Sequence, residues 1–82
     1  MSELRNWWLY ELHDGHEIVF YGISCDSVRR EPADSGKRFT YMKVISVGLT
    51  RSEAENRERD EIQRYQSQHG GIPPKYNEQL KS

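Results

Sequence analysis

One acidic residue stands apart from the others by its position on a predicted helix. Between residues 50 and 68 the chain is almost wholly polar, and its few apolar residues, Ala54, Ile62 and Tyr65, fall on one side of a helix. Glu58 lies four residues from two of them and in the middle of their stripe, whereas the other acids, such as Glu61, are expected outside it. An inward carboxylate is costly unless it pairs with an arginine or binds a cation. Glu58 is therefore a candidate metal ligand, with a simple arginine pair as the alternative.

Basic residues gather in one part of the chain, where they could contact a phosphate backbone. Guanidinium and ammonium groups bind phosphate oxygens, the former in a bidentate manner. The formal net charge of -1 gives the whole chain no basic surface, so an ordinary solvated segment is the alternative. The residues concerned are Arg29, Arg30, Lys37, Arg38 and Lys43.

Three segments have the composition of β-strands. Residues 7–12 and 17–24 are rich in aromatic and branched side chains, and they flank Asp14-Gly15, a pair typical of tight hairpin turns. Residues 39–49 form the third predicted strand, with a run of branched residues. An antiparallel sheet built on one hairpin is expected.

Alternation along the strands predicts which side chains share a face of this sheet. In the first strand it places Trp8 and Tyr10 together. In the second strand it separates Phe20 from Val19 and Tyr21. Tyr21 is accordingly assigned to the core on the face opposite Tyr10.

A long helix is the best-defined predicted element. Thr50 and Glu53 form a Thr-x-x-Glu capping box, which predicts a helix from residue 51 to about residue 68, and Gly70-Gly71 ends it. Weaker signals predict a short helical turn at residues 26–30 and another at residues 77–82.

Length and composition restrict the class of protein. With 82 residues, of which 34% are hydrophobic, the chain is expected to form one α/β (α+β) domain: a small three-stranded antiparallel sheet with a β-hairpin, flanked by helices. A cytoplasmic protein is expected, because no apolar stretch suits a membrane span or a signal peptide. The single cysteine, Cys25, excludes an internal disulfide.

Several short motifs follow one another along the chain. In order they are Trp8-Leu9-Tyr10, Phe20-Tyr21-Gly22, Asp26 and Arg30 after that glycine, Glu58 in the long predicted helix, and Pro74-Lys75-Tyr76-Asn77. From about residue 7 to residue 77 this series resembles the GIY-YIG nuclease domain, in which GIY, YIG, a metal-binding helix and a closing Pro-x-Tyr-Asn occur in the same order.

The resemblance implies hydrolysis of phosphodiester bonds in DNA, or possibly RNA, with one divalent metal ion, Mg²⁺ or Mn²⁺. It makes Tyr10 the general base, Arg30 a clamp on a phosphate oxygen, Glu58 the metal ligand and Asn77 a supporting residue. Nucleic acid would be contacted by Arg29, Lys37, Arg38 and Lys43.

Departures from the motifs leave other functions open. Phe20 replaces the first tyrosine of YIG, Trp8 replaces the glycine of GIY, and residues 31–34 lack the histidine that often follows the helix arginine. Lys37 or Arg38 could supply the missing cation from the following loop. The alternatives are a noncatalytic module of the same fold that binds nucleic acid or a protein partner, and a small adaptor with chance motifs. A nuclease of this size would need a protein partner, a dimer or substrate structure for targeting.

Overall fold

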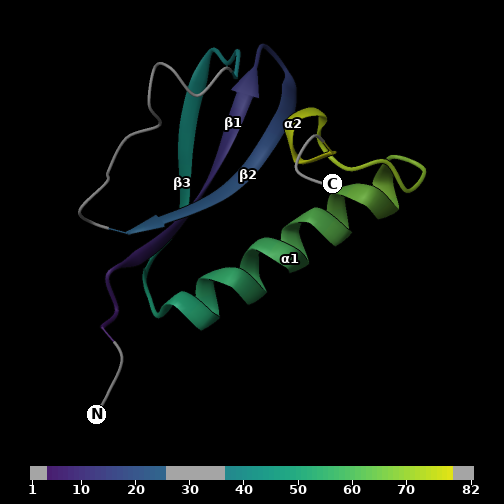
Figure 1. The fold of residues 1–82 in the computed structure, drawn as a ribbon. Helices are drawn as coiled ribbons and strands as arrows, with labels where there is room; N and C mark the ends of the chain where they lie inside the picture. Colours follow the sequence, from purple (N-terminus) through teal and green to yellow (C-terminus); the bar gives the residue numbers. More distant parts are fainter. Residues whose placement is uncertain (1–3, 26–36, 79–82) are drawn as a thin grey trace.

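A three-stranded antiparallel sheet and two helices make up the computed structural model, which describes residues 4–25 and 37–78. In chain order the elements are β1 (Trp7–Asp14), β2 (Glu17–Cys25), β3 (Tyr41–Leu49), α1 (Arg51–Gln68) and α2 (Lys75–Glu78). The strand order is β2-β1-β3, so both neighbours of the central strand β1 run antiparallel to it (Figure 1). The predicted α+β fold, with its hairpin sheet and flanking helices, is confirmed. The turn predicted at residues 26–30 lies outside the described residues.

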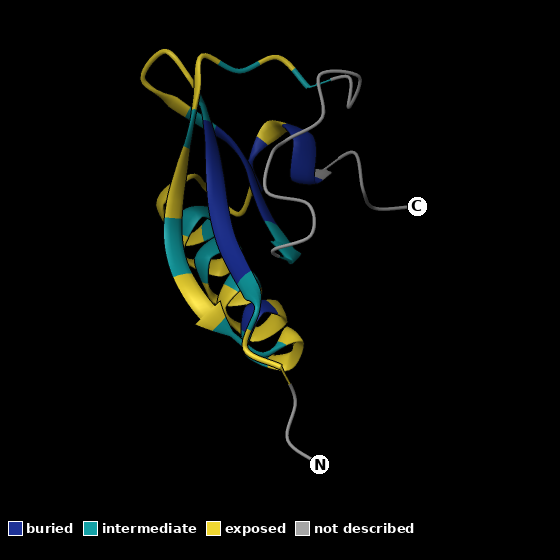
Figure 2. Ribbon diagram, turned by 90° about the vertical axis from the view of Figure 1, so that its left-hand side faces the viewer, coloured by how far each residue is buried: buried dark blue, intermediate teal, exposed yellow. Residues whose placement is uncertain are grey.

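The two faces of the sheet have different neighbours. Helix α1 contacts all three strands, and it covers the face that carries Glu11 and Tyr21. The opposite face carries a buried cluster that includes Tyr10 and Phe20, as alternation predicts. Figure 2 shows that β1 is mostly buried, whereas β3 and the outer side of α1 are largely exposed. The sheet therefore has one face that packs against α1 and one face that carries the aromatic cluster.

A β-bulge interrupts the alternation of β2. The pairing passes from Leu12 opposite Phe20 to His13 opposite Ile18, so Val19 is an extra residue on β2. Val19 joins the same buried cluster as Phe20 instead of the opposite face. The predicted separation of Val19 from Phe20 is therefore wrong, because a bulge lets two successive side chains lie on one side.

Local signals set the ends of α1 where the sequence predicts them. The Thr50 hydroxyl accepts a hydrogen bond from the Glu53 N–H at 3.1 Å, and the Glu53 carboxylate accepts one from the Thr50 N–H at 3.0 Å. The helix ends before Gly70 and Gly71, which have φ angles of 67° and 87°. Ala54 is fully buried and anchors the first half of α1 on the sheet. No helix within residues 4–25 and 37–78 is long and apolar enough to span a membrane.

Helix α2 is short and attaches to the outer strand β2. Pro73 and Pro74 are buried before it, and Tyr76 joins the aromatic cluster on the sheet. The Tyr76 hydroxyl accepts a hydrogen bond from the Arg38 N–H at 2.9 Å, which ties α2 to the residues that precede β3. The turn predicted from Asn77 onward thus begins two residues earlier, at Lys75.

Candidate active site

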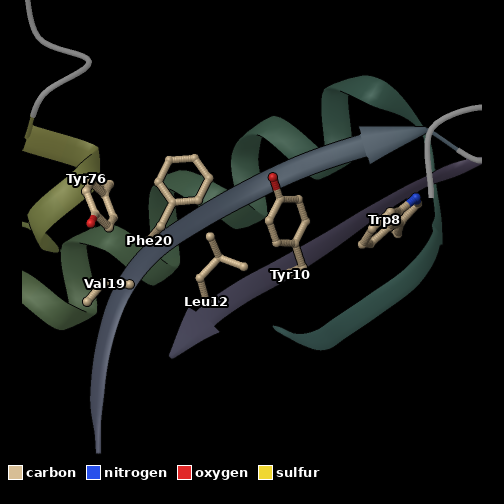
Figure 3. Close-up of a cluster of buried hydrophobic side chains, with 6 residues drawn as sticks. All are labelled: Trp8, Tyr10, Leu12, Val19, Phe20 and Tyr76. Carbon is tan, nitrogen blue, oxygen red and sulfur yellow. The ribbon is translucent and has the colours of Figure 1, made fainter. Parts of the chain in front are cut away.

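Tyr10 lies on the central strand in the middle of an aromatic cluster. Its ring centroid is 5.1 Å from that of Trp8 and 6.1 Å from that of Phe20, and the residue is 7% exposed. Figure 3 shows these side chains together with Leu12, projecting from β1 and β2 on one side of the sheet. Such contacts on both sides restrict the ring to one orientation, which is what a positioned catalytic hydroxyl requires.

Gly22 provides the space into which the Tyr10 hydroxyl projects. The two residues are directly opposite each other in the register of β1 and β2. A Cβ atom at position 22 would lie 2.6 Å from the Tyr10 hydroxyl oxygen and 2.5 Å from Cε2 of Phe20. Only glycine fits here without displacing an aromatic ring. This steric requirement explains why the YIG-like motif ends in glycine.

Lys37 places a positive charge beside this cluster. Its Nζ atom lies 4.6 Å from the centroid of the Phe20 ring, in a cation–π contact. Phe20 in turn neighbours Tyr10, so an ammonium group and a phenol flank the same ring. Arg38, by contrast, is exposed, and its described hydrogen bond is made by its backbone N–H to Tyr76.

Glu58 is half-buried on the inner side of α1, as its helical position predicts. Within residues 4–25 and 37–78 it forms no ion pair or hydrogen bond, so the alternative of a structural arginine pair finds no support there. Burial raises the pKa of Glu58 above its ordinary value, and the nearby carboxylate of Glu55 adds to this effect, whereas Arg59 opposes it. A carboxylate that is costly to ionise and unpaired would gain from a bound cation.

Asn77 and Glu58 line the same open pocket, of about 620 Å³, between α1 and the segment leading into α2. Asn77 is buried, and its side-chain amide makes two hydrogen bonds with the backbone of Tyr21. Its Oδ1 accepts from the Tyr21 N–H at 2.8 Å, and its Nδ2 donates to the Tyr21 carbonyl at 3.0 Å. These bonds hold α2 against the outer edge of β2, which is a positioning role.

Residues 20 to 22 of β2 connect the two groups of candidate residues. Phe20 contacts Tyr10 and Lys37, the backbone of Tyr21 holds Asn77, and Gly22 receives the Tyr10 hydroxyl. The supporting contacts are the cation–π pair, the two amide hydrogen bonds and the close approach at Gly22. The Tyr10 cluster lies on the face of the sheet opposite α1, whereas Glu58 is on α1, and the described residues that line the pocket of Glu58 and Asn77 do not include Tyr10 or Lys37. The candidate residues therefore form two groups, on either side of this stretch of the outer strand.

Not all predicted site residues belong to these two groups. Lys43 lies on β3, opposite Glu11, and lines a different pocket on the α1 side of the sheet. Arg29 and Arg30 lie outside the described residues. Of the described residues expected to contact nucleic acid, Lys37 is thus the one that lies against the aromatic cluster, on the ring of Phe20.

Sequence reasoning missed two acids that face the interior. Glu61 was expected outside the inward stripe, yet its side chain is only 15% exposed, so that expectation is wrong. It follows Ala54 by seven residues, nearly two full helical turns, which brings it back to the same side. Glu11 is 9% exposed within the buried strand β1. The sequence signal for Glu11 is a charged residue between the apolar residues Tyr10 and Leu12 of a predicted strand.

The donor set around Glu58 suits a magnesium ion better than a transition metal. No group of three or more His, Cys, Asp or Glu side chains that could hold a metal occurs in the described part of the chain. Mg²⁺ is commonly held by one or two carboxylates, several waters and substrate phosphate oxygens. Glu58 offers one such carboxylate, and Glu55 in the same pocket is an exposed second one that pairs with Arg51 at 3.4 Å.

In comparisons with known proteins, no family model, no curated protein and no solved structure matches the chain. The likeness to GIY-YIG nucleases therefore depends on the sequence motifs alone.

Proposed function

We propose that the chain is a GIY-YIG-like endonuclease domain that hydrolyses phosphodiester bonds in DNA, with one divalent metal ion at Glu58. The observation that carries this proposal is the carboxylate of Glu58, half-buried and without an ion pair in the described residues, in a pocket shared with Asn77. Both residues are those that the family motifs assign to the site. RNA is the second substrate to test, because hydrolysis of either backbone has the same chemical requirements.

Tyr10 is the general base in this proposal. In the phenolate form its oxygen would take a proton from the attacking water and become a hydroxyl, and Trp8, Phe20 and Gly22 hold the ring in place. An ordinary phenol is protonated near neutral pH, so a neighbouring cation must favour the phenolate form. Lys37 is the described residue suited to this role, because it lies on the Phe20 ring, which is next to Tyr10. It would replace the histidine that the motif lacks.

Glu58 would hold Mg²⁺ or Mn²⁺, which supplies charge neutralisation at the phosphoryl and leaving oxygens. Asn77 keeps the pocket wall in register with β2 through its two hydrogen bonds to Tyr21. The resemblance assigns a phosphate clamp to Arg30, which lies outside the described residues.

A noncatalytic module of the same fold is the second candidate. Phe20 supports it, because the residue at this position carries no hydroxyl group and its ring face is covered by Lys37. Such a module would bind nucleic acid or a protein partner and leave it intact. In such a module the basic residues would still be needed for binding, whereas Glu58 would not.

The test is cleavage by purified protein with Mg²⁺ or Mn²⁺ of supercoiled plasmid, single-stranded DNA and structured RNA. We expect wild type to cleave DNA and Glu58→Gln to lose cleavage, while Asp60→Asn retains it. Asp60 is an exposed acid on the same helix, so this control makes an equal change in charge. Intact substrates with wild type, or equal cleavage by Glu58→Gln, would reject the nuclease proposal. Metal-independent retention of DNA in a gel-shift assay would then favour the binding module.

A further inference from the structure

A second pocket lies on the other face of the sheet, between the strands and the C-terminal half of α1. It has a volume of about 570 Å³, and its walls include Glu11 and Tyr21 from the strands and Glu61 and Tyr65 from α1. We call it the Glu11 pocket. None of these side chains has a role in the proposed nuclease site, so the pocket can be considered independently of that site.

Two buried polar groups open into the Glu11 pocket. Glu11 is 9% exposed and Tyr21 is 6% exposed, and the two residues are directly paired across β1 and β2. One carboxylate oxygen of Glu11 lies 2.8 Å from Nε2 of His13. The Tyr21 hydroxyl has no hydrogen-bond partner within residues 4–25 and 37–78, although its backbone is bonded to Asn77. The hydroxyl is not among the fully enclosed polar atoms of the described residues, so it is open to the pocket and available to a ligand.

The acids of the pocket are more deeply buried than its cations, although Nη1 of Arg64 donates to both carboxylate oxygens of Glu61, at 3.2 and 3.3 Å. The side chain of Glu61 is 15% exposed, whereas that of its ion-pair partner Arg64 is 67% exposed. Lys43, the other lining cation, is also exposed on β3. The pKa of Tyr21 reflects this gradient. Burial, followed by the charges of Glu11 and Glu61, raises it to about 12, and Arg64 opposes the shift.

Aromatic rings complete the wall on the side of α1. Tyr65 stacks on His69 with a centroid distance of 3.7 Å, and both residues line the pocket. Ring faces beside buried carboxylates favour organic cations.

We propose that the Glu11 pocket binds an alkylammonium group, at the end of a free polyamine or on a lysine side chain. An ammonium group has three donors. Glu11 and Glu61 supply carboxylate acceptors and Tyr21 supplies a hydroxyl oxygen. The adjoining methylene chain would lie along the ring of Tyr65. At Glu61 the ammonium group would share the carboxylate with Arg64, whose Nη1 already donates to it.

Calorimetry and amide NMR with putrescine and spermidine test this proposal, with a neutral diol of the same length as putrescine as control. We expect the amines to bind, with shifts at Glu11, Tyr21 and Tyr65, and the diol not to bind. A peptide with one free lysine, compared with its acetylated form, tests the second source. Binding of the peptide alone would identify a lysine side chain as the natural ligand, and binding of free amines would identify a polyamine. Equal binding of the diol, shifts reproduced by MgCl₂, or no binding by any amine would overturn the proposal.

Variants separate the contact from general charge effects. Glu11→Gln should weaken amine binding roughly tenfold or more, because a charged hydrogen bond is lost. Tyr21→Phe should weaken it several-fold while retaining the buried ring. Asp60→Asn removes one exposed acid outside the pocket and should leave affinity unchanged, and an equal loss in this control would reject the proposal. If Glu11→Gln does not fold, Tyr21→Phe still tests the proposal, because it removes only the hydroxyl group. Glu58→Gln should still bind amines, so failure of the nuclease proposal can be distinguished from failure of this one.

Discussion

The carboxyl group of Glu58 makes the stability of the folded state depend on pH. Because burial raises its pKa above the ordinary value of 4.5, the folded protein binds the proton more tightly than the unfolded chain does. Stability is therefore unaffected below the unfolded pKa and falls as pH rises from that value through the higher folded pKa. A cation bound at Glu58 would reverse this loss at neutral pH.

We predict that Glu58→Gln is more stable than wild type at neutral pH and that the difference disappears in acid below the ordinary glutamate pKa. Thermal unfolding across the pH range measures this difference. Mg²⁺ should raise the melting temperature of wild type and of Asp60→Asn, but not of Glu58→Gln. A wild-type protein indifferent to Mg²⁺ would contradict metal binding at this residue.

Gly22 gives a second prediction at the scale of one residue. Gly22→Ala places a methyl group against the Tyr10 hydroxyl and the Phe20 ring, so it should cost about 1 to 3 kcal/mol in the free energy of unfolding. Cleavage should fall more than this loss explains, because the Tyr10 hydroxyl must move. Denaturant unfolding and cleavage rates measure the two effects. If Mg²⁺ raises the stability of Gly22→Ala as much as that of wild type, the substitution does not affect Glu58. Full cleavage activity of Gly22→Ala would contradict the role of Tyr10.

The third residue prediction concerns the missing hydroxyl of the YIG-like motif. Phe20→Tyr restores it beside Lys37 and close to Tyr10, and should raise the cleavage rate if a phenol at this position assists catalysis. Phe39→Tyr, a partly buried ring packed against the same cluster, is the matched control and should not raise the rate. A faster control would point to a general effect of packing.

At the scale of the element, the described side-chain hydrogen bonds between α2 and β2 are made by one residue, which acts beside the packing of Tyr76. Asn77→Ala leaves the N–H and carbonyl of Tyr21 without partners and should cost about 2 to 3 kcal/mol. Hydrogen exchange should increase in α2 and at Tyr21 while α1 remains protected. Asn56→Ala, at an exposed position on α1, should change stability little. Equal effects of the two substitutions would show that the amide does not anchor α2.

The elements differ in how much of them the sequence predicts. The bounds of α1 follow from the Thr50–Glu53 capping box and the glycines after the helix, because these signals act within one or two turns. The bulge at Val19 depends on pairing between strands, so composition alone does not reveal it. The burial of Glu61 is not predicted for a simpler reason. The apolar residues of α1 mark only a narrow stripe around Glu58, whereas the buried side of the helix is wider. The double hydrogen bond of Asn77 links positions far apart in sequence and was predicted only as general support.

For the whole molecule, the formal net charge of -1 predicts weak binding to nucleic acid that depends on a local set of cations. If all five clustered basic residues neutralise phosphates of duplex DNA, log K against log salt should have a slope of about -4 to -5. Fluorescence anisotropy at several salt concentrations measures it. Lys37→Gln should make the slope shallower by about one unit, and Arg64→Gln, at the rim of the Glu11 pocket, should not. A slope near zero would exclude phosphate contacts as the basis of binding.

The amide of Asn77 also affects how the sheet ends. An outer strand presents free backbone groups to which another chain can add. By bonding both backbone groups of Tyr21, Asn77 imitates one peptide unit of a fourth strand and closes β2 at that point. The other outer strand, β3, pairs irregularly with β1 around Leu9 and carries Gly48 at a φ angle of 68°, which disfavours a regular neighbour. The contact that supports the site thus also guards this small sheet against edge-to-edge aggregation.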